Sequence, residues 1–129
     1  MRGGVILIDG DAGNEIGGVM RRGLIAVHGK TGDFLGVSMI AGTILTFGPA
    51  GSRPGAGMKR GTLGLFAGQP ALLPTFRFSC IYQPPFLPLY FAKLREWGMQ
   101  IDSELMHAPL SRYSGDLVAL GKGEILCMP

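Results

Sequence analysis

The stretch GGVMRRGLIAV at residues 17–27 contains the pattern that decides the fold, because variants of it recur every 19 residues. Its methionine has counterparts at the same spacing, which are Met1, Met20, Met39 and Met58. A glycine three residues later recurs in step, at Gly4, Gly23, Gly42 and Gly61. A fixed period of this length is typical of a solenoid, in which each repeat packs only against its neighbours. The glycines are therefore interpreted as turn residues and not as a nucleotide-binding motif.

A short, largely apolar run follows each of these glycines. Such runs are too short for helices and are flanked by glycine, so they are predicted to be strands. One strand per 19 residues suits a parallel β-helix whose strands stack about 4.8 Å apart. Alternation along the strands predicts two inward-facing columns, namely Ile6, Ile25, Ile44 and Leu63, and then Ile8, Val27, Thr46 and Leu65. The methionines, with Ile16 and Leu35, are expected to fill the rest of the interior.

The array is expected to end near Gly68, where the fourth repeat loses its pattern. Ala67 stands where glycine is expected, and Pro70 replaces the last turn glycine. The sequence therefore divides into a repeat array at residues 1–68 and a capping extension at residues 69–129. A solenoid needs such an extension to close its open end.

The capping extension begins with a segment rich in proline and aromatic residues, at residues 69–89. This segment is predicted to lie as extended chain across the last coil. A helix is predicted at about residues 88–97, with Gly98 as its stop. Its apolar stripe is expected to dock it on the solenoid through Tyr90, Leu94 and Trp97. A last strand is predicted at residues 124–127.

The other end of the array has no cap, because Met1 occupies the same repeat position as Met20. An uncapped coil exposes apolar side chains and an unpaired strand edge, which favours association. Further coils of a longer protein would cover this end, as would another subunit, including a second copy of this chain. The expectation favoured here is that the sequence is the C-terminal portion of a longer protein.

Composition narrows the class of protein. A hydrophobic content of 47% with 16% charged residues predicts a packed core in place of disorder. The net charge of +3 is too small to indicate nucleic-acid binding, and no apolar stretch is long enough to span a membrane. With no secretory leader, Cys80 and Cys127 are expected to stay reduced, which makes a cytoplasmic protein the default interpretation.

The sequence offers little for catalysis or metal binding. Its two histidines, His28 and His107, lie at no metal-ligand spacing from a cysteine or carboxylate, and His28 is expected to face solvent. The carboxylates of Asp102 and Glu104 lie in a loop before the terminal segment. No nucleophile, base and orienting group can be assembled from these residues. The chain is therefore predicted to be non-catalytic on its own, with no metal site and no bound cofactor.

Two apparent ligand-binding motifs do not fit their patterns. The stretch GDLVALGKG at residues 115–123 has the wrong glycine spacing for a phosphate loop and lacks its serine or threonine. It is interpreted as a turn and a closing strand. Calcium-binding β-helices carry an aspartate in every nonapeptide repeat, whereas only Asp11 and Asp33 occupy comparable turns here.

Basic residues recur just before the predicted strands. One repeat position carries Arg2, Arg21 and Lys59, and the next carries Arg22 and Arg60, with a gap at Ile40 and Ala41. Stacking of the coils would align these side chains into a basic stripe. Two interpretations stay open: a solvated edge that aids solubility, and a docking strip for an acidic partner surface or a polyanionic cofactor tail.

The repeat G-x-x-M-[RK]-x-G-x-[IL], at residues 17–25 and 55–63, resembles a known family. It is similar to the GXGXG right-handed β-helix found in the C subunit of formylmethanofuran dehydrogenase and in the large subunit of glutamate synthase. The tail, with residues 112–116 and 121–126, resembles the first of these. The aromatic stretch at residues 78–82 and the helix after it resemble the version in methylotrophic bacteria, where the complex is a formyltransferase/hydrolase.

This resemblance implies a non-catalytic scaffold subunit of a complex in one-carbon metabolism. Such a complex moves a formyl group between tetrahydromethanopterin and methanofuran, or couples carbon dioxide reduction to methanofuran formylation, and other subunits carry the chemistry. The resemblance assigns no catalytic residue to this chain. Two alternatives stay open: a glutamate synthase β-helix that spaces catalytic domains, and a free-standing homo-oligomeric solenoid that acts as a binding module.

Overall fold

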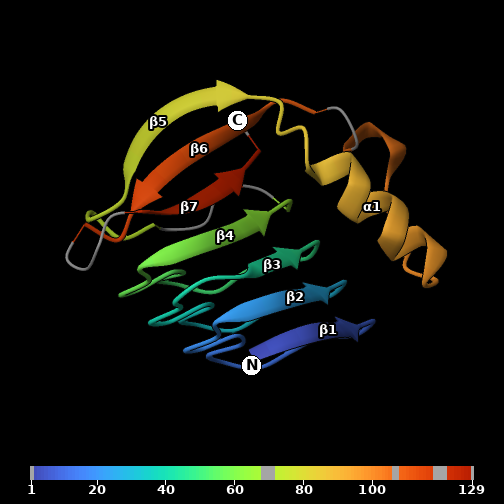
Figure 1. The fold of residues 1–129 in the computed structure, drawn as a ribbon, viewed down its shortest axis with the longest axis horizontal. Coiled ribbons are helices and arrows are strands. Elements are labelled where there is room, and N and C mark those ends of the chain that lie inside the picture. The colour runs from blue at the N-terminus through green and yellow to red at the C-terminus, as the bar shows by residue number, and fades with distance from the viewer. Residues whose placement is uncertain (1, 68–71, 106–107, 118–121, 129) are drawn as a thin grey trace.

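The computed structural model describes residues 2–67, 72–105, 108–117 and 122–128. The fold is a seven-stranded sheet in the order β1-β2-β3-β4-β7-β6-β5, with one α-helix among the described residues (Figure 1). The strands are β1 (Arg2–Ile8), β2 (Arg22–Val27), β3 (Thr43–Thr46), β4 (Arg60–Leu65), β5 (Arg77–Tyr82), β6 (Leu110–Gly115) and β7 (Lys122–Cys127). The helix is α1 (Leu87–Glu96), and a short 3-10 helix, η1, spans Ser103–Leu105. The prediction of an all-β fold with one helix is confirmed.

The first four strands pair parallel and in the register of the repeat. Ile25 pairs with Ile44, which pairs with Leu63, so each partner lies one 19-residue repeat further along. The segments between the strands stack in the same way: the N–H of Gly29 donates to the carbonyl of Gly10 at 3.0 Å. Side chains add rungs at this offset, because Asp11 Oδ1 accepts the N–H of Lys30 at 2.7 Å. Successive repeats are thus joined along their whole length and not only through their strands.

The predicted inward-facing columns form the larger of two hydrophobic clusters. Ile25, Ile44 and Leu63 are all buried, as are the methionines Met20, Met39 and Met58. Ile6, at the start of its column, is 45% exposed instead, since no strand lies beyond β1 in the described part of the chain. The predicted inward-facing residues are therefore buried from the second repeat onward, whereas Ile6 in the first repeat is exposed.

Some repeat glycines are required by close approach and not by backbone conformation. Gly48 and Gly29 are not among the residues with positive φ, in contrast to Gly23 (φ 101°) and Gly42 (φ 109°). A Cβ on Gly48 would lie on the carbonyl oxygen of Gly29, and one on Gly29 would lie 2.6 Å from that of Gly10. These positions must stay without a side chain because the turns of neighbouring coils touch through their main chains.

The C-terminal part of the chain extends the sheet. β7 pairs parallel with β4, Leu63 with Ile125 and Leu65 with Cys127, so it continues both apolar columns. β6 and β5 then add antiparallel, which makes the sheet mixed. The prediction that residues 69–89 cover the last coil is wrong for β5, which lies at the far edge of the sheet (Figure 1). The apolar alternation of β7 matches the columns, and this match places β7 next to β4 instead. The expected boundary at Gly68, with Pro70, lies outside the described residues.

Helix α1 begins and ends one residue earlier than the predicted range of 88–97. Its buried residues are Leu87, Phe91 and Leu94. The predicted stripe is therefore wrong at Trp97, which is 48% exposed and follows the last helical residue. Phe91 packs against the stacked rings of Phe47 and Phe66, at centroid distances of 6.0 and 5.4 Å. This contact forms a second core on the opposite face of the sheet from the coil interior, with Leu24, Ala26, Leu45 and Leu126.

Candidate functional site

Most of the parallel strands begin with a basic residue. Arg2, Arg22, Arg60 and Lys122 are the first residues of β1, β2, β4 and β7. Arg21 and Lys59 precede two of them, and all of these side chains that the structure describes are exposed. The row of basic residues is interrupted at β3, which lies between β2 and β4 and begins at Thr43. The sequence predicted this gap at Ile40 and Ala41. The basic stripe thus runs across the starting ends of the strands.

The register corrects one alignment within the stripe. The 19-residue period places Arg2 with Arg21, but β1 pairs Arg2 with Arg22. An irregularity between Arg2 and Val5 shifts the register by one residue, and Gly4 there has a φ of 83°. Such a bulge adds one residue to one strand of a pair, which is why a fixed period misplaces Arg2.

Lys122 is a member of the stripe that the repeat did not predict. It lies far outside the array in sequence, yet it pairs directly with Arg60. A signal for it was present, since Lys122-Gly123-Glu124-Ile125 repeats the order of Arg60-Gly61-Thr62-Leu63: a base, a glycine, a variable residue and an aliphatic residue. Strand β7, the fifth parallel strand, therefore carries the same short motif as the repeat strands, although it does not follow them at the 19-residue spacing.

The stripe is electrostatically uncompensated within the described chain. The ion pairs found there, Lys93–Glu96 and Arg112–Glu124, include none of its cations. Like charges at paired positions of neighbouring strands, as at Arg60 and Lys122, destabilise a sheet by roughly 0.2–1 kcal/mol. An anionic partner placed along the strand starts would relieve that repulsion.

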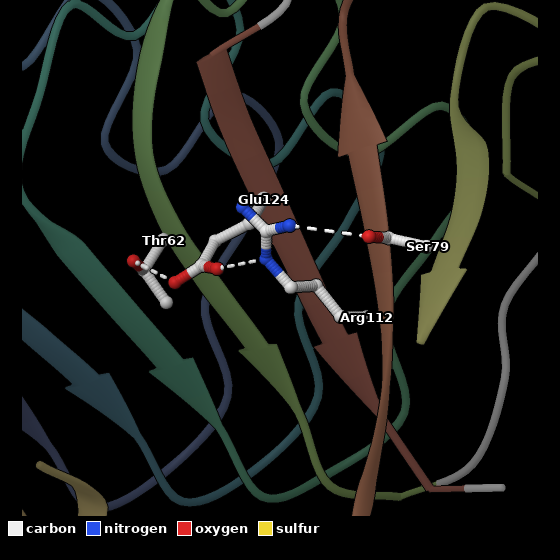
Figure 2. Close-up of polar contacts among 4 residues, drawn as sticks. All are labelled: Thr62, Ser79, Arg112 and Glu124. Atoms are coloured by element: carbon white, nitrogen blue, oxygen red, sulfur yellow. Dashed lines mark hydrogen bonds and ion pairs between the residues drawn. The ribbon is translucent and has the colours of Figure 1, made fainter. Parts of the chain in front are cut away.

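A second polar feature lies on the outer face of β4, β7, β6 and β5 (Figure 2). Arg112 Nε donates to Glu124 Oε2 at 2.6 Å, and the hydroxyl of Thr62 donates to Glu124 Oε1 at 2.9 Å. Arg112 also donates to the hydroxyl of Ser79 at 3.3 Å. The hydrogen bond to Glu124 raises the pKa of Arg112, and burial raises the pKa of Tyr82 nearby. Both charged groups are partnered, so this network ties four strands together and offers no free acid or base.

His28, which was predicted to face solvent, is partly exposed. It lines a pocket of about 550 Å³ with Phe47, Phe66, Gln100, Ile101, Asp102 and Leu105. The lining thus combines residues of the repeats with residues of the segment after α1, an arrangement that the repeat pattern alone does not reveal. His107 lies outside the described residues.

The remaining candidate aspartates accept hydrogen bonds from backbone N–H groups. Asp102 Oδ1 accepts the backbone N–H of Glu104 at 3.0 Å. Asp33, like Asp11, accepts an N–H one repeat along, from Ser52 at 2.8 Å. The stretch at residues 115–123 is only partly described. Among the described residues no cluster of histidine, cysteine and carboxylate side chains could hold a metal ion, and no helix is long and apolar enough to cross a membrane.

Comparison with known proteins gives an informative match among solved structures. No protein-family model matches the chain, and no curated protein sequence does. Among solved structures, a chain in the crystal structure of the formyltransferase/hydrolase complex (FhcABCD) from Methylorubrum extorquens, in complex with methylofuran, matches with a TM-score of 0.70. This chain resembles a component of that complex. The sequences are 34% identical, and the match covers 99% of this chain but 57% of the other. The chain therefore spans little more than half the length of its structural neighbour.

Proposed function

We propose that this chain is a structural, non-catalytic subunit of a formyltransferase/hydrolase-type complex in one-carbon metabolism. The observation that carries this proposal is the match to the FhcABCD structure, at an identity well above that at which only the fold is shared. The repeat signature and the tail support the same branch over a glutamate synthase domain. In this proposal the formyl chemistry, and the binding of a methanofuran-type carrier and of tetrahydromethanopterin, belong to other subunits.

The geometry supports a scaffold role. Main-chain contacts at the glycines join successive repeats, and β7 pairs in parallel with β4 after the last repeat strand. A stack of this kind, which we propose is a single-stranded right-handed parallel β-helix, is rigid along its axis because every rung is hydrogen-bonded to the next. The carboxylate of Glu124 is paired with Arg112 and is therefore not a free acid or base. Rigidity of this kind suits a subunit that positions others.

The basic stripe is the surface proposed to dock an acidic face of a neighbouring subunit. Its exposed cations, Arg21, Arg22, Lys59, Arg60 and Lys122, follow one line across the strand starts, and the described chain supplies them with no carboxylate. Complementary charge at an interface mainly speeds association and selects the partner. A line of cations along a rigid edge is suited to selecting one acidic strip on a partner.

The test is purification of the tagged chain from its native cells, followed by mass spectrometry of the proteins that accompany it. A formyltransferase and an amidohydrolase-like subunit are expected to co-purify. Recovery of the chain without either would overturn the proposed complex.

The stripe is tested in the same assay with Arg21→Glu/Arg22→Glu. The matched control is Lys30→Glu/Arg53→Glu, which changes the net charge equally at two exposed cations on the turns. Loss of the partners in the first variant alone is expected. Equal recovery with both variants would exclude docking through the stripe while leaving the membership of the complex intact.

A further inference from the structure

The pocket around His28 contains polar groups that the proposed function does not use. His28, Phe47 and Phe66 directly follow the last residues of β2, β3 and β4, so they occupy the same repeat position in successive repeats. The rings of Phe47 and Phe66 are stacked at a centroid distance of 5.2 Å, with an interplanar angle of 22°. Phe66 is buried, whereas Phe47 and His28 are partly exposed. One part of the pocket lining is therefore a row of two aromatic rings and an imidazole.

The rest of the lining comes from residues 100–105, which are held in place by helix α1. Arg95 donates from Nε and Nη2 to the carbonyl of Ile101, at 3.2 and 2.6 Å. The side chain of Ile101 is buried in the core between α1 and the sheet, whereas Gln100 and Asp102 on either side of it are exposed. The lining is thus fixed before a ligand binds, which reduces the entropic cost of binding.

Three polar groups of the lining have hydrogen-bonding capacity that the described residues leave unused. The imidazole of His28 and the carboxamide of Gln100 make no hydrogen bond with the described part of the chain. Asp102 accepts the backbone N–H of Glu104 through Oδ1, which leaves Oδ2 available. No lysine or arginine is among the described residues that line the pocket. The lining therefore offers a carboxylate and further acceptors, but no cation that would hold a phosphate or a carboxylate.

These groups suit a planar cation. A guanidinium or amidinium group can lie flat on an aromatic ring while its N–H groups, which lie in its own plane, donate to a carboxylate. Phe47 supplies the ring and Asp102 supplies the carboxylate, while His28 and Gln100 can each accept a further N–H. The pocket volume of about 550 Å³ lies within the range of small-ligand sites, so it accommodates such a group together with the body that carries it.

We propose that this pocket binds a planar nitrogen cation of the amidinium or guanidinium class, with its face on Phe47 and its N–H groups directed to Asp102. Small molecules and the arginine side chains of proteins both carry such a cation, so a free ligand and an arginine of a partner subunit share this chemistry. Binding at this pocket does not depend on the proposed membership of a complex; only the second source does.

The first probe is benzamidine, a phenyl ring with an amidinium group, and its matched control is benzoate, an anion of the same shape. Each is titrated into the purified chain while the proton NMR signal of the His28 Cε1–H, assigned by its loss in His28→Gln, is followed. Benzamidine is expected to shift this signal with saturation, and benzoate is expected to leave it unchanged. No saturable shift with benzamidine, or an equal shift with benzoate, would overturn the proposal.

Variants identify the carboxylate. Asp102→Asn keeps the oxygen that accepts the N–H of Glu104 but removes the charge, so it is expected to weaken benzamidine binding about fivefold, near the upper limit for an exposed ion pair. Glu104→Gln removes the same charge from an exposed residue that does not line the pocket, and should bind like the parent chain. Phe47→Leu keeps an apolar side chain without the aromatic face, and should also weaken binding. Unchanged binding in Asp102→Asn, or equal weakening in Glu104→Gln, would overturn the proposed site.

The two sources of the cation are distinguished in the complex purified from native cells, by saturation-transfer NMR on benzamidine. If an arginine of a partner subunit fills the pocket, binding that Asp102→Asn weakens is expected in the isolated chain only. If the ligand is a free molecule, such binding is expected in the isolated chain and in the complex. If no complex is recovered, the proposed function fails, while the titration of the isolated chain still decides whether the pocket binds a planar cation.

Discussion

Arg112 Nε lies 2.6 Å from Glu124 Oε2, so a guanidinium on β6 is paired with a carboxylate on β7. The same carboxylate accepts the Thr62 hydroxyl from β4 through its other oxygen. One side chain thus holds the last strand to the coil array on one side and to the antiparallel strands on the other. The parallel and antiparallel parts of the sheet meet at β7, where Glu124 makes both contacts.

Glu124→Gln is expected to lower the free energy of unfolding by about 1–3 kcal/mol, the typical cost of losing a hydrogen bond to a charged group. The carboxylate is only 15% exposed, so solvent replaces little of the lost interaction. Urea denaturation measures the change. Glu96→Gln is the control, because its ion pair with Lys93 is about two-thirds exposed and should contribute less than about 0.5 kcal/mol. Equal losses in the two variants would contradict a role for Glu124 in joining the strands.

Gly48→Ala is expected to destabilise the fold by about 1–3 kcal/mol, the range for overpacking. The added methyl group would lie on the main chain of Gly29, which cannot move without shifting the neighbouring coil. Gly10→Ala is a matched control at the same repeat position, where no atom lies within 4 Å of the added Cβ. Unfolding of the dilute chain, where any self-association is negligible, should show a loss for Gly48→Ala only.

Phe91→Ala is expected to lower the free energy of unfolding by about 3–5 kcal/mol, since the ring is fully buried against Phe47 and Phe66. Leu89→Ala on the same helix removes a side chain that is 73% exposed and should change stability by less than about 0.5 kcal/mol. Thermal unfolding of both variants compares them. A small effect at Phe91 would mean that α1 is not held against the sheet.

The two thiols are expected to differ in reactivity. Cys80 is exposed on β5, whereas Cys127 is fully buried, and burial raises the pKa of its thiol. Because the thiolate is the reactive form, the folded chain should react with Ellman's reagent at Cys80 only, and Cys127 should react after unfolding. Native Cys80→Ser should show no rapid reaction. Rapid labelling of two thiols in the folded parent chain would contradict the placement of Cys127.

The 19-residue period was sufficient to predict the coil interior. Hydrophobic alternation fixes which face of a strand is buried, and equal spacing fixes which residues stack, so Ile25, Ile44 and Leu63 could be aligned by counting residues alone. The same argument predicted the basic stripe at Arg22 and Arg60. It misplaced Arg2, because a bulge changes the residue count locally without changing the sequence pattern.

In the C-terminal part, local sequence predicted the helix and the last strand at residues 124–127, but not the contacts that these elements make. A helix before Gly98 follows from local sequence, but its buried face depends on which aromatic residues of the coils it meets, and this favoured Phe91 over Trp97. The pairing of β7 with β4 is a contact between distant segments, which no period indicates. Lys122 and the pocket around His28 were missed for this reason.

The position of β7 has a consequence for how the protein is made. Each coil strand can bond to the one before it as soon as it leaves the ribosome, but β4 must wait for a strand that begins at Lys122. At the usual 5–20 residues per second of synthesis, the interval between Leu65 and Lys122 lasts roughly 3–11 s. Throughout this time the growing end of the stack is an open template for other nascent chains. The β4 edge is therefore most open to mispairing with other chains during translation, before β7 has been synthesised.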